Sequence, residues 1–385
     1  MQQLCQNLKD GKTEIVHVPV PGVQPGHLLV RTTYSLISAG TERMLVDFAR
    51  AGYLAKARQQ PEKVRQVLDK IRTDGLAPTL QSVAAKLDQP MPMGYCNVGR
   101  VLAVGEGVDG FSVGDRVASN GPHAEVVMAP KNLAARIPDE VANDQAVFTV
   151  VGAIGLQGVR LLQPTLGETF AVFGLGLIGL LGVQVLKAHG ARVIGFDFDA
   201  GRVELARSFG VQAEDLSRGA DPVAMALAAT REMGVDGVLV TAATKSDELM
   251  HHAAQMCRRR GRIVLTGVTG LNLQRSDFYE KELSFQVSCS YGPGRYDPVY
   301  EDQGHDYPAG FVRWTEQRNF EAVLELMRDG RLDTAPLVSR RIPFGEAEAA
   351  YDLLADRSIV GILLHYPEAR NEEARRALTA PVICH

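Results

Sequence analysis

The spacing of hydrophobic residues divides the chain into segments that favour different kinds of structure. Near the N-terminus, short runs of alternating polar and apolar residues at 13–18 and 27–35 are separated by prolines and glycines. This alternation predicts short strands joined by tight turns. Further strands are expected at 99–104, at 115–117 and as a pair within 120–138. The first part of the chain is therefore expected to be β-rich.

A helical segment interrupts this β-rich part between residues 44 and 87. Its apolar side chains are spaced three or four residues apart among many charges, as at Val64, Val67, Leu68 and Ile71. Such spacing is typical of an amphipathic helix. We expect a helical insertion that packs on its own domain or on a partner.

From residue 169 onward, apolar runs alternate with segments of helical periodicity. Strands that alternate with helices of about ten residues predict right-handed crossovers and a parallel sheet. The expected strands are 169–173, 192–197, 211–215, 237–241, 262–266 and 283–290, and the expected helices are 177–187, 202–209, 222–233 and 246–259. The sequence thus predicts an α/β fold that combines a β-rich domain with a doubly wound parallel sheet.

Composition narrows the possible functions. The 385 residues exceed the ~150 of a typical domain, so two or three domains are expected. A formal net charge of −4 gives no basic excess, which argues against a nucleic-acid binder. The five cysteines show no Cys-x-x-Cys spacing, which indicates reduced thiols rather than disulfides. Because we see neither a signal-peptide pattern nor an uninterrupted apolar span, we expect a soluble, cytoplasmic protein without a membrane segment.

A glycine-rich motif, GLGLIG at 174–179, directly follows the apolar run TFAVF and precedes a predicted helix. In dinucleotide-binding folds the first glycine allows a tight turn, the second lets the backbone approach a pyrophosphate, and the third allows close packing of helix and strand. The helix N-terminus offers free N–H groups to the phosphates. The motif therefore predicts a dinucleotide site, and the alternative is a glycine turn without a ligand.

Asp197 indicates which dinucleotide is bound. It ends the strand after the glycine motif, where a carboxylate accepts hydrogen bonds from ribose hydroxyls and repels a 2′-phosphate. NAD is therefore expected rather than NADP, although Arg202 lies close enough in sequence to weaken the preference. The predicted cofactor residues are Gly174, Leu175, Gly176, Leu177, Ile178, Gly179, Asp197, Arg202, Thr241 and Gly267.

Other short motifs accompany the glycine motif in a fixed order. They are Gly40-Thr41-Glu42, Gly94 with Gly99-Arg100-Val101, Gly105-Glu106-Gly107-Val108, Phe111-Ser112-Val113-Gly114-Asp115-Arg116-Val117 and His123-Ala124-Glu125-Val126. With them the chain resembles the medium-chain, zinc-type alcohol dehydrogenase superfamily over nearly all its length. The resemblance implies a GroES-like substrate domain at 1–152, a Rossmann domain at 153–291, and a return to the substrate domain at 292–385. It also implies a homodimer or homotetramer that pairs through the sheet edge at 283–290.

The chain departs from this family at the positions that hold zinc. The resemblance places the catalytic zinc ligands at a cysteine before Gly-Thr/Ser-Asp, at a His-Glu pair after a glycine, and at a cysteine or acid before the Rossmann domain. The corresponding residues here are Ala39, the pair Tyr95-Cys96, and approximately Val150. Alanine and valine cannot ligate, and the family's four-cysteine structural lobe is missing. We therefore expect no metal at either site.

Without a metal, ordinary side chains must stabilise the charge that develops on the substrate oxygen. Tyr95 takes the place of the family's histidine ligand and is the first candidate for proton donor or acceptor, whereas a ring that only fills space is the alternative. Thr41 matches the hydroxyl that begins the family's proton relay and is the second candidate. Cys96 has no basic neighbour in sequence to activate it, so a packed thiol is favoured over a reactive one.

A tyrosine-rich segment follows the last predicted strand; it begins with YGPGRYDPVY at residue 291 and continues through HDYP at 305–308 to Arg313-Trp314. Long loops without regular structure are uncommon unless they bind or cover something. Its aromatic and charged side chains suit a hydroxyl-rich ligand, and an oligomer contact is the alternative. The candidate substrate residues are Tyr291, Arg295 and Tyr296 of this segment, together with Cys96. Segments like TYSLISAGTERM and RWTEQRN resemble a zinc-less subgroup, some of whose members are fused to a second oxidoreductase domain and associated with surface-sugar biosynthesis.

These expectations combine into one functional hypothesis. It is a zinc-independent, NAD(H)-dependent oxidoreductase that acts on a secondary alcohol or ketone of a sugar, nucleotide sugar or cyclitol. One alternative is a reductase of conjugated double bonds in enones or quinones. Another relative in the family oxidises a hydroxyethyl group on a chlorophyll precursor, and that activity stays open. The alternative from a different class is a non-catalytic NAD-binding partner of another oxidoreductase.

Overall fold

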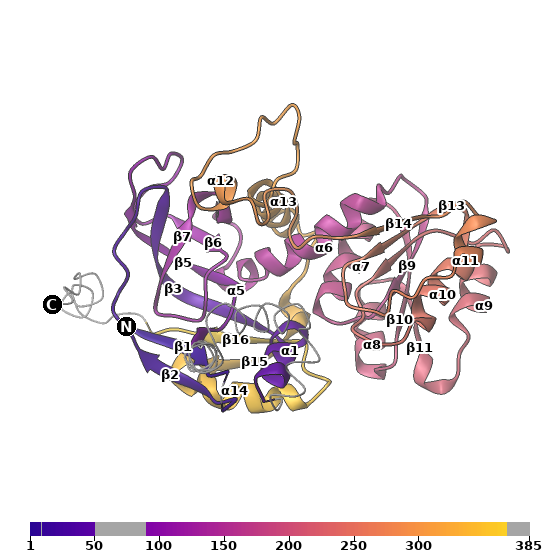
Figure 1. The fold of residues 1–385 in the computed structure, drawn as a ribbon, viewed down its shortest axis with the longest axis horizontal. Coiled ribbons are helices and arrows are strands. Elements are labelled where there is room, and N and C mark those ends of the chain that lie inside the picture. The colour runs from indigo at the N-terminus through magenta and orange to yellow at the C-terminus, as the bar shows by residue number, and fades with distance from the viewer. Residues whose placement is uncertain (9, 51–89, 368–385) are drawn as a thin grey trace, which may run out of the picture.

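The computed structural model describes residues 1–8, 10–50 and 90–367. Figure 1 shows a β-rich part on the left and a part with one open sheet on the right, with helix α6 (Thr149–Leu162) between them. The chain begins in the left-hand part, crosses to the right-hand part, and returns to the left for its last strands.

The right-hand part is a parallel sheet covered by helices. Its strands are β9 (Thr169–Phe173), β10 (Arg192–Asp197), β11 (Gln212–Asp215), β12 (Val235–Val240), β13 (Cys257–Leu265) and β14 (Ser284–Val287). Its helices are α7 (Leu177–Ala188), α8 (Ala200–Ser208), α9 (Pro222–Ala229), α10 (Glu248–Met256) and α11 (Arg275–Tyr279). The strand order β11-β10-β9-β12-β13-β14 is that of a doubly wound dinucleotide-binding sheet.

The left-hand part is built on mostly antiparallel pairs. A seven-stranded sheet has the order β15-β16-β3-β5-β6-β8 with β7 also paired to β3, and a smaller sheet has the order β2-β1-β4. The strands are β1 (Gln2–Gln6), β2 (Thr13–His17), β3 (His27–Ser38), β4 (Met91–Pro92), β5 (Asn97–Val104), β6 (Arg116–Ser119), β7 (Val126–Pro130), β8 (Ala134–Arg136), β15 (Val338–Pro343) and β16 (Gly361–His365). The helices are α1 (Ala39–Arg50), α5 (Asn143–Ala146), α12 (Pro298–Glu301), α13 (Glu316–Arg328) and α14 (Ala347–Asp352). The predicted fold class, a β-rich domain with a parallel sheet, is confirmed.

One hydrophobic core joins the two parts through helix α6. Buried side chains of α6, such as Val150 and Leu156, belong to the same cluster as Cys96 and Val98 of the β-rich part. The cluster continues into the parallel sheet through Val172 and into helices α7 and α13. Because this core is continuous, the two parts pack against one another through α6.

The predicted helix 246–259 is wrong at its C-terminal end. Helix α10 stops at Met256, and β13 begins at Cys257. The register of β13 against β12 shifts over the arginine-rich turn, where Arg260 has a φ of 60°. Ion pairs hold this segment on the sheet, with Arg258 Nε 2.6 Å from Asp236 Oδ1 and Arg262 Nη2 2.5 Å from Glu168 Oε1. The predicted insertion at 44–87 begins within α1, and its residues 51–87 lie outside the described residues.

The tyrosine-rich segment is fixed to the β-rich part rather than free of it. It contains the short helix α12, and Tyr300 is fully buried with its ring stacked on Tyr307 at 5.2 Å. The β-rich part also forms hydrogen bonds with this segment; for example, the side-chain amide Asn132 Nδ2 donates to the backbone oxygen of Tyr300 at 2.8 Å. At the end of the segment, Trp314 lies between two guanidinium groups, with Arg160 Cζ 3.4 Å and Arg313 Cζ 3.8 Å from its ring centroid.

Candidate active site

The glycine turn between β9 and α7 leaves open space beside one glycine and close contact at the other two. Gly174 has a φ of 88°, and a Cβ there would lie 2.7 Å from Ala242 N. A Cβ on Gly179 would lie 1.8 Å from Gly174 O, so only glycine fits. A Cβ on Gly176 would meet nothing within 4 Å. The turn is therefore closed towards the protein and open at Gly176, which leaves its backbone accessible to a phosphate group.

Asp197 is held against this turn at the carboxyl end of β10. Its Oδ2 accepts a hydrogen bond from Leu175 N at 2.6 Å, and its Oδ1 accepts one from Asp199 N at 2.9 Å. Arg202 Nη1 lies 3.8 Å from Asp197 Oδ2, while Arg202 Nη2 donates to Arg357 O at 2.5 Å. Backbone N–H groups thus orient the Asp197 carboxylate, and the Arg202 guanidinium contacts both this carboxylate and the backbone oxygen of Arg357.

The other predicted cofactor residues lie at the same edge of the sheet. Thr241 Oγ1 donates to Gly174 O at 2.5 Å and so braces the glycine turn from β12. Gly267 follows β13, and a Cβ there would lie 2.2 Å from Ala242 O. In α7 Leu177 is buried and Ile178 is partly buried, so these two side chains pack inward and their backbone N–H groups begin the helix. The structure therefore places all ten predicted residues around the carboxyl ends of the strands.

Tyr95 and Thr41 meet in the β-rich part, as the resemblance implies. Tyr95 OH donates to Thr41 Oγ1 at 3.3 Å, although the two residues are separated by 54 positions in sequence. Tyr95 follows Gly94, whose φ is 89°, and Thr41 lies in the first turn of α1. Burial raises the pKa of Tyr95 well above its usual range, and this effect is larger than the lowering by its hydrogen bonds with Ser38 and Thr41. The phenol therefore stays protonated, which suits a hydrogen-bond or proton donor.

The positions that hold zinc in the family do not fit a zinc ion here. Ala39 and Val150 are buried and carry no ligand atom. Burial raises the pKa of the Cys96 thiol well above its usual range, so the thiolate that zinc requires is disfavoured. Within the described ranges we find no group of three or more histidine, cysteine, aspartate or glutamate side chains that could hold a metal.

The three candidate substrate residues of the tyrosine-rich segment differ in their surroundings. Tyr291 is buried, and its hydroxyl accepts a hydrogen bond from Asn120 Nδ2 at 2.6 Å. Arg295 Nη1 forms an ion pair with Glu301 Oε1 at 2.6 Å and lies over the Tyr291 ring at 5.3 Å. Tyr296 has a φ of 67° and is 72% exposed, so its ring contacts solvent and the Arg295 side chain. The structure therefore brings Tyr291 and Arg295 together and leaves Tyr296 at the surface.

Glu316, at the start of α13, has an unusual environment that predicts a pH-dependent stability. Its side chain is fully buried, and neither carboxylate oxygen has a hydrogen-bond partner among the described residues. Burial, and next the charge of Glu301, raise the pKa of Glu316 to about 9. Between the unfolded value of ~4.5 and about 9, the folded state keeps a proton that the unfolded state has lost. Stability is therefore expected to fall as pH rises through this window.

The substitution Glu316→Gln should remove this effect, because glutamine is neutral at every pH. At pH 8 we expect the variant to be more stable than the wild type by on the order of 2 kcal/mol. Thermal melts between pH 5 and 9 test this, with Glu325→Gln, an exposed carboxylate on the same helix, as the control. An equal pH slope for the wild type and Glu316→Gln would show that Glu316 is ionised in the fold.

Sequence reasoning missed several polar residues near these candidates. His123 and Glu42 were noted only as parts of family motifs, yet their side chains are fully buried and lie 3.2 Å apart. Asn120 and Glu316 were not singled out at all. Glu42 lies in α1 and His123 precedes β7, and no pattern in the sequence pairs these two residues or marks Glu316 as buried.

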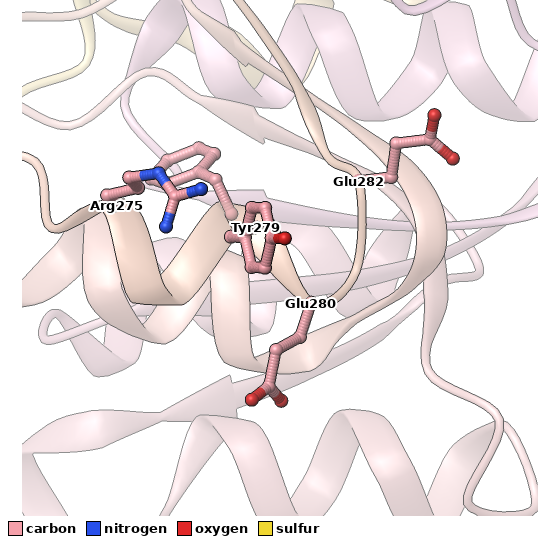
Figure 2. Close-up of a pocket in the computed structure, with 5 residues that line it drawn as sticks. Arg275, Tyr279, Glu280 and Glu282 are labelled. Carbon is pink, nitrogen blue, oxygen red and sulfur yellow. The ribbon is translucent and has the colours of Figure 1, made fainter.

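A separate hollow lies at α11, away from the glycine turn. Figure 2 shows the side chains of Arg275, Tyr279, Glu280 and Glu282, which line it. The volume of the hollow is about 620 Å³. The Arg275 guanidinium stacks on the Tyr279 ring at 3.9 Å. None of the predicted site residues lines this hollow, so we assign it no part in the chemistry.

Comparison with known proteins agrees with the fold. Residues 178–302 match the family described as zinc-binding dehydrogenase. The (R,R)-butanediol dehydrogenase of Bacillus subtilis (strain 168) is 26% identical over 307 residues, which cover 71% of this chain and 81% of that protein. The D-guloside 3-dehydrogenase of Escherichia coli (strain K12) is 27% identical over 275 residues, which cover 69% of this chain and 74% of that protein.

The structural match extends further along the chain. Alcohol dehydrogenase TADH from Thermus sp. ATN1 superposes with a TM-score of 0.72 at 20% identity, covering 95% of this chain and 100% of that one. The resemblance found in the sequence is therefore confirmed. The chain is similar in sequence to dehydrogenases of the alcohol dehydrogenase type, and it shares their fold over most of its length. It is accordingly an oxidoreductase with a dinucleotide-binding fold.

Proposed function

We propose that this chain is a zinc-independent, NAD(H)-dependent oxidoreductase that acts on a secondary alcohol or ketone of a polar, hydroxylated substrate. The observation that carries the proposal is the glycine turn, open only at Gly176 and flanked by the oriented Asp197 carboxylate. The names of the relatives, a butanediol and a guloside dehydrogenase, support an alcohol substrate with several hydroxyls. Sugars, nucleotide sugars and cyclitols share that chemistry.

The cofactor would be held by this chain's own backbone and carboxylate. The N–H groups at the start of α7 would bind the pyrophosphate, and Asp197 would accept hydrogen bonds from the adenosine ribose. When bound, the nicotinamide supplies or accepts a hydride. The remaining chemistry is proton transfer and stabilisation of charge on the substrate oxygen.

Tyr95 is proposed to stabilise that oxygen. Its phenol is protonated, because burial raises its pKa, and its hydroxyl is anchored by Thr41. The phenol has one O–H, which donates to Thr41 Oγ1 here, so on substrate binding it would turn from Thr41 to the substrate oxygen. In ketone reduction it would then donate a hydrogen bond to the developing alkoxide and pass its proton to that oxygen, leaving a phenolate that takes a proton back from solvent.

Asp197 predicts a strong preference between the two nicotinamide cofactors. We expect kcat/KM to be at least ~10-fold higher with NADH than with NADPH, because the carboxylate repels the 2′-phosphate, and tenfold corresponds to ~1.4 kcal/mol. Asp197→Ser should remove this repulsion and reduce the ratio, since Arg202 is then left to attract the phosphate. Steady-state rates with both cofactors test this, and a strong NADPH preference of the wild type would overturn the assignment.

Zinc independence is tested by metal content. We expect the purified chain to contain well under one zinc per chain and to keep its turnover after treatment with a chelator, because the donor set at Ala39, Cys96 and Val150 does not suit the ion. Elemental analysis before and after chelation gives the answer. One zinc per chain whose removal abolishes activity would reverse this part of the proposal.

A panel of substrates separates an enzyme from a non-catalytic NAD-binding partner. NADH binding is first measured by fluorescence titration, and turnover is then assayed with butanediol, xylitol, inositol and sugar nucleotides. Turnover of any polyol or sugar supports the proposal. Binding of NADH without turnover on the whole panel, alone or with a candidate partner oxidoreductase, favours the non-catalytic role.

We further propose that the chain forms a homodimer or homotetramer. Strand β14 is the last strand of the parallel sheet, and Val287 on it is 54% exposed. An open sheet edge of this kind can pair with a second copy. The proposed location is the cytoplasm. No helix within the described part of the chain has the length and hydrophobicity needed to span a bilayer.

A further inference from the structure

A fully buried polar network lies directly behind the proposed Tyr95–Thr41 pair. The Glu42 carboxylate, in the first turn of α1, accepts hydrogen bonds from Ser38 N at 3.1 Å and from Tyr351 OH. His123 Nε2 lies 3.2 Å from Glu42 Oε2, and both side chains are 0% exposed. Glu42 adjoins Thr41 in sequence, so the carboxylate fixes the helical turn that carries one member of the pair.

His123 supports the other member of the pair. Its ring packs against Gly94, where a Cβ would lie only 2.6 Å from His123 Cγ and Cδ2. His123 N also donates to Met93 O at 2.7 Å. Gly94 and Met93 immediately precede Tyr95, so the imidazole supports the turn from which Tyr95 reaches Thr41.

The network continues to a second hydroxyl pair on the far side of His123. His123 Nδ1 lies 2.7 Å from Ser35 Oγ, and Ser35 Oγ lies 2.9 Å from Tyr366 OH. Every ring nitrogen of His123 and both oxygens of Glu42 therefore have partners. A buried polar network that is fully satisfied holds its members in one geometry, whereas loss of one partner leaves the others unpaired in a medium of low dielectric.

We propose that His123 and Glu42 are positioning residues for the proton donor of this site. Together they hold Tyr95 and Thr41 at hydrogen-bonding distance from two separate segments of the chain, which keeps the phenol in place without a metal. This inference rests on the proposed function, because it assigns the network a role in the step that Tyr95 performs.

Two substitutions of His123 form a matched pair, because each places an amide near only one of the two ring nitrogens of the imidazole. In His123→Gln the side-chain amide reaches about as far as Nε2 and can still donate to Glu42, whereas in His123→Asn it reaches only about as far as Nδ1. We expect His123→Asn to lower kcat ~10- to 100-fold and His123→Gln to restore it to within a few fold of the wild type. The Kd for NADH should stay unchanged in both, because the glycine turn lies in the other part of the molecule.

A double-mutant cycle distinguishes positioning from general damage. In a Tyr95→Phe background, His123→Asn should lower kcat less than twofold further, because the hydroxyl that it positions is already gone. Equal losses in the two backgrounds would overturn the proposal, as would wild-type kcat in His123→Asn. His251→Gln, which removes an exposed histidine paired with Asp277 at 2.9 Å, is the control and should change nothing.

Hydrogen exchange gives a readout that does not depend on turnover. We expect faster amide exchange over residues 91–98 in His123→Asn, with no change in His123→Gln and none in strands β9 and β10. If His123→Asn does not fold, Ser35→Ala takes its place in both measurements, since it removes the hydrogen bonds of Ser35 Oγ to His123 Nδ1 and to Tyr366 OH but leaves the His123–Glu42 contact. If no substrate of the panel is turned over, the proposed function is wrong, but the positioning role can still be tested by exchange. If exchange over residues 91–98 is unchanged in His123→Asn, the positioning role is wrong, whatever the substrate panel shows.

Discussion

Replacing Gly176 with leucine is expected to abolish NADH binding while leaving the fold intact. The glycine has open space on the side where a Cβ would stand, and its φ of −69° is one that leucine adopts easily. The new side chain would fill the space through which the backbone reaches the pyrophosphate. We expect Kd for NADH to rise ~1000-fold, or ~4 kcal/mol, with the melting temperature within a degree or two of the wild type.

Substitutions at two other glycines serve as controls for this prediction. Gly345 also has open space, and Gly345→Leu should leave both NADH binding and stability unchanged. Gly179→Ala should instead lower the melting temperature, because its Cβ would lie 1.8 Å from Gly174 O. Fluorescence titration and thermal melts of the three variants suffice. Wild-type affinity in Gly176→Leu would mean that the dinucleotide lies elsewhere.

The substitution Tyr95→Phe should lower kcat by ~100-fold or more, a loss typical of removing a general acid. The ring is kept, so packing against its neighbours in the core is unchanged, and only the hydroxyl bonded to Thr41 disappears. We therefore expect little change in the Kd for NADH or in stability. Single-turnover rates with the best substrate of the panel measure the chemical step directly.

The outcome for Tyr95 can be compared with a tyrosine elsewhere. Tyr296→Phe removes a hydroxyl from a ring that is 72% exposed and should leave kcat within twofold of the wild type. Wild-type turnover in Tyr95→Phe would exclude Tyr95 from the mechanism. The next candidate would then be Tyr291, whose hydroxyl already accepts a hydrogen bond from Asn120 and so directs its own proton elsewhere.

The strands around the glycine turn could be predicted from sequence because the residues that define them are consecutive in the chain. Residues 169–173 and 192–197 are apolar runs bounded by glycine or polar residues, and the observed β9 and β10 have these bounds. Both faces of these strands are covered by helices, so the apolar run coincides with the strand. The glycine motif could be predicted for the same reason. The positions where only glycine fits and the position that must stay open all lie within six consecutive residues.

The end of α10 was missed because its cause is tertiary. Arg258, expected in the helix, lies instead in β13, where it pairs with Asp236, and Arg262 of the same strand pairs with Glu168. Both carboxylates are distant in sequence from these arginines. Periodicity alone cannot weigh such ion pairs against helical propensity. Considered by itself, a run of arginines favours the C-terminal end of a helix. In this chain the pairing of the segment with the sheet outweighs that local preference.

The candidate site was predictable only where a family motif carried it. Thr41 and Tyr95 were found because they occupy positions that the resemblance marks, and the structure brings them together. Glu42 and His123 are 81 positions apart in sequence, and the pair has no sequence pattern of its own. Pairs of this kind follow from how strands are arranged in a sheet, so they become visible only when the sheet order is known.

The stacking of Trp314 between Arg160 and Arg313 provides the protein with a built-in optical probe. It is the chain's single tryptophan, so the intrinsic emission reports on one place only. Arg160 belongs to the helix between the two sheets, whereas Trp314 and Arg313 belong to the tyrosine-rich segment. Any displacement of that segment relative to the helix would unstack the indole and shift its spectrum, so ligand-induced motion there can be followed without a label.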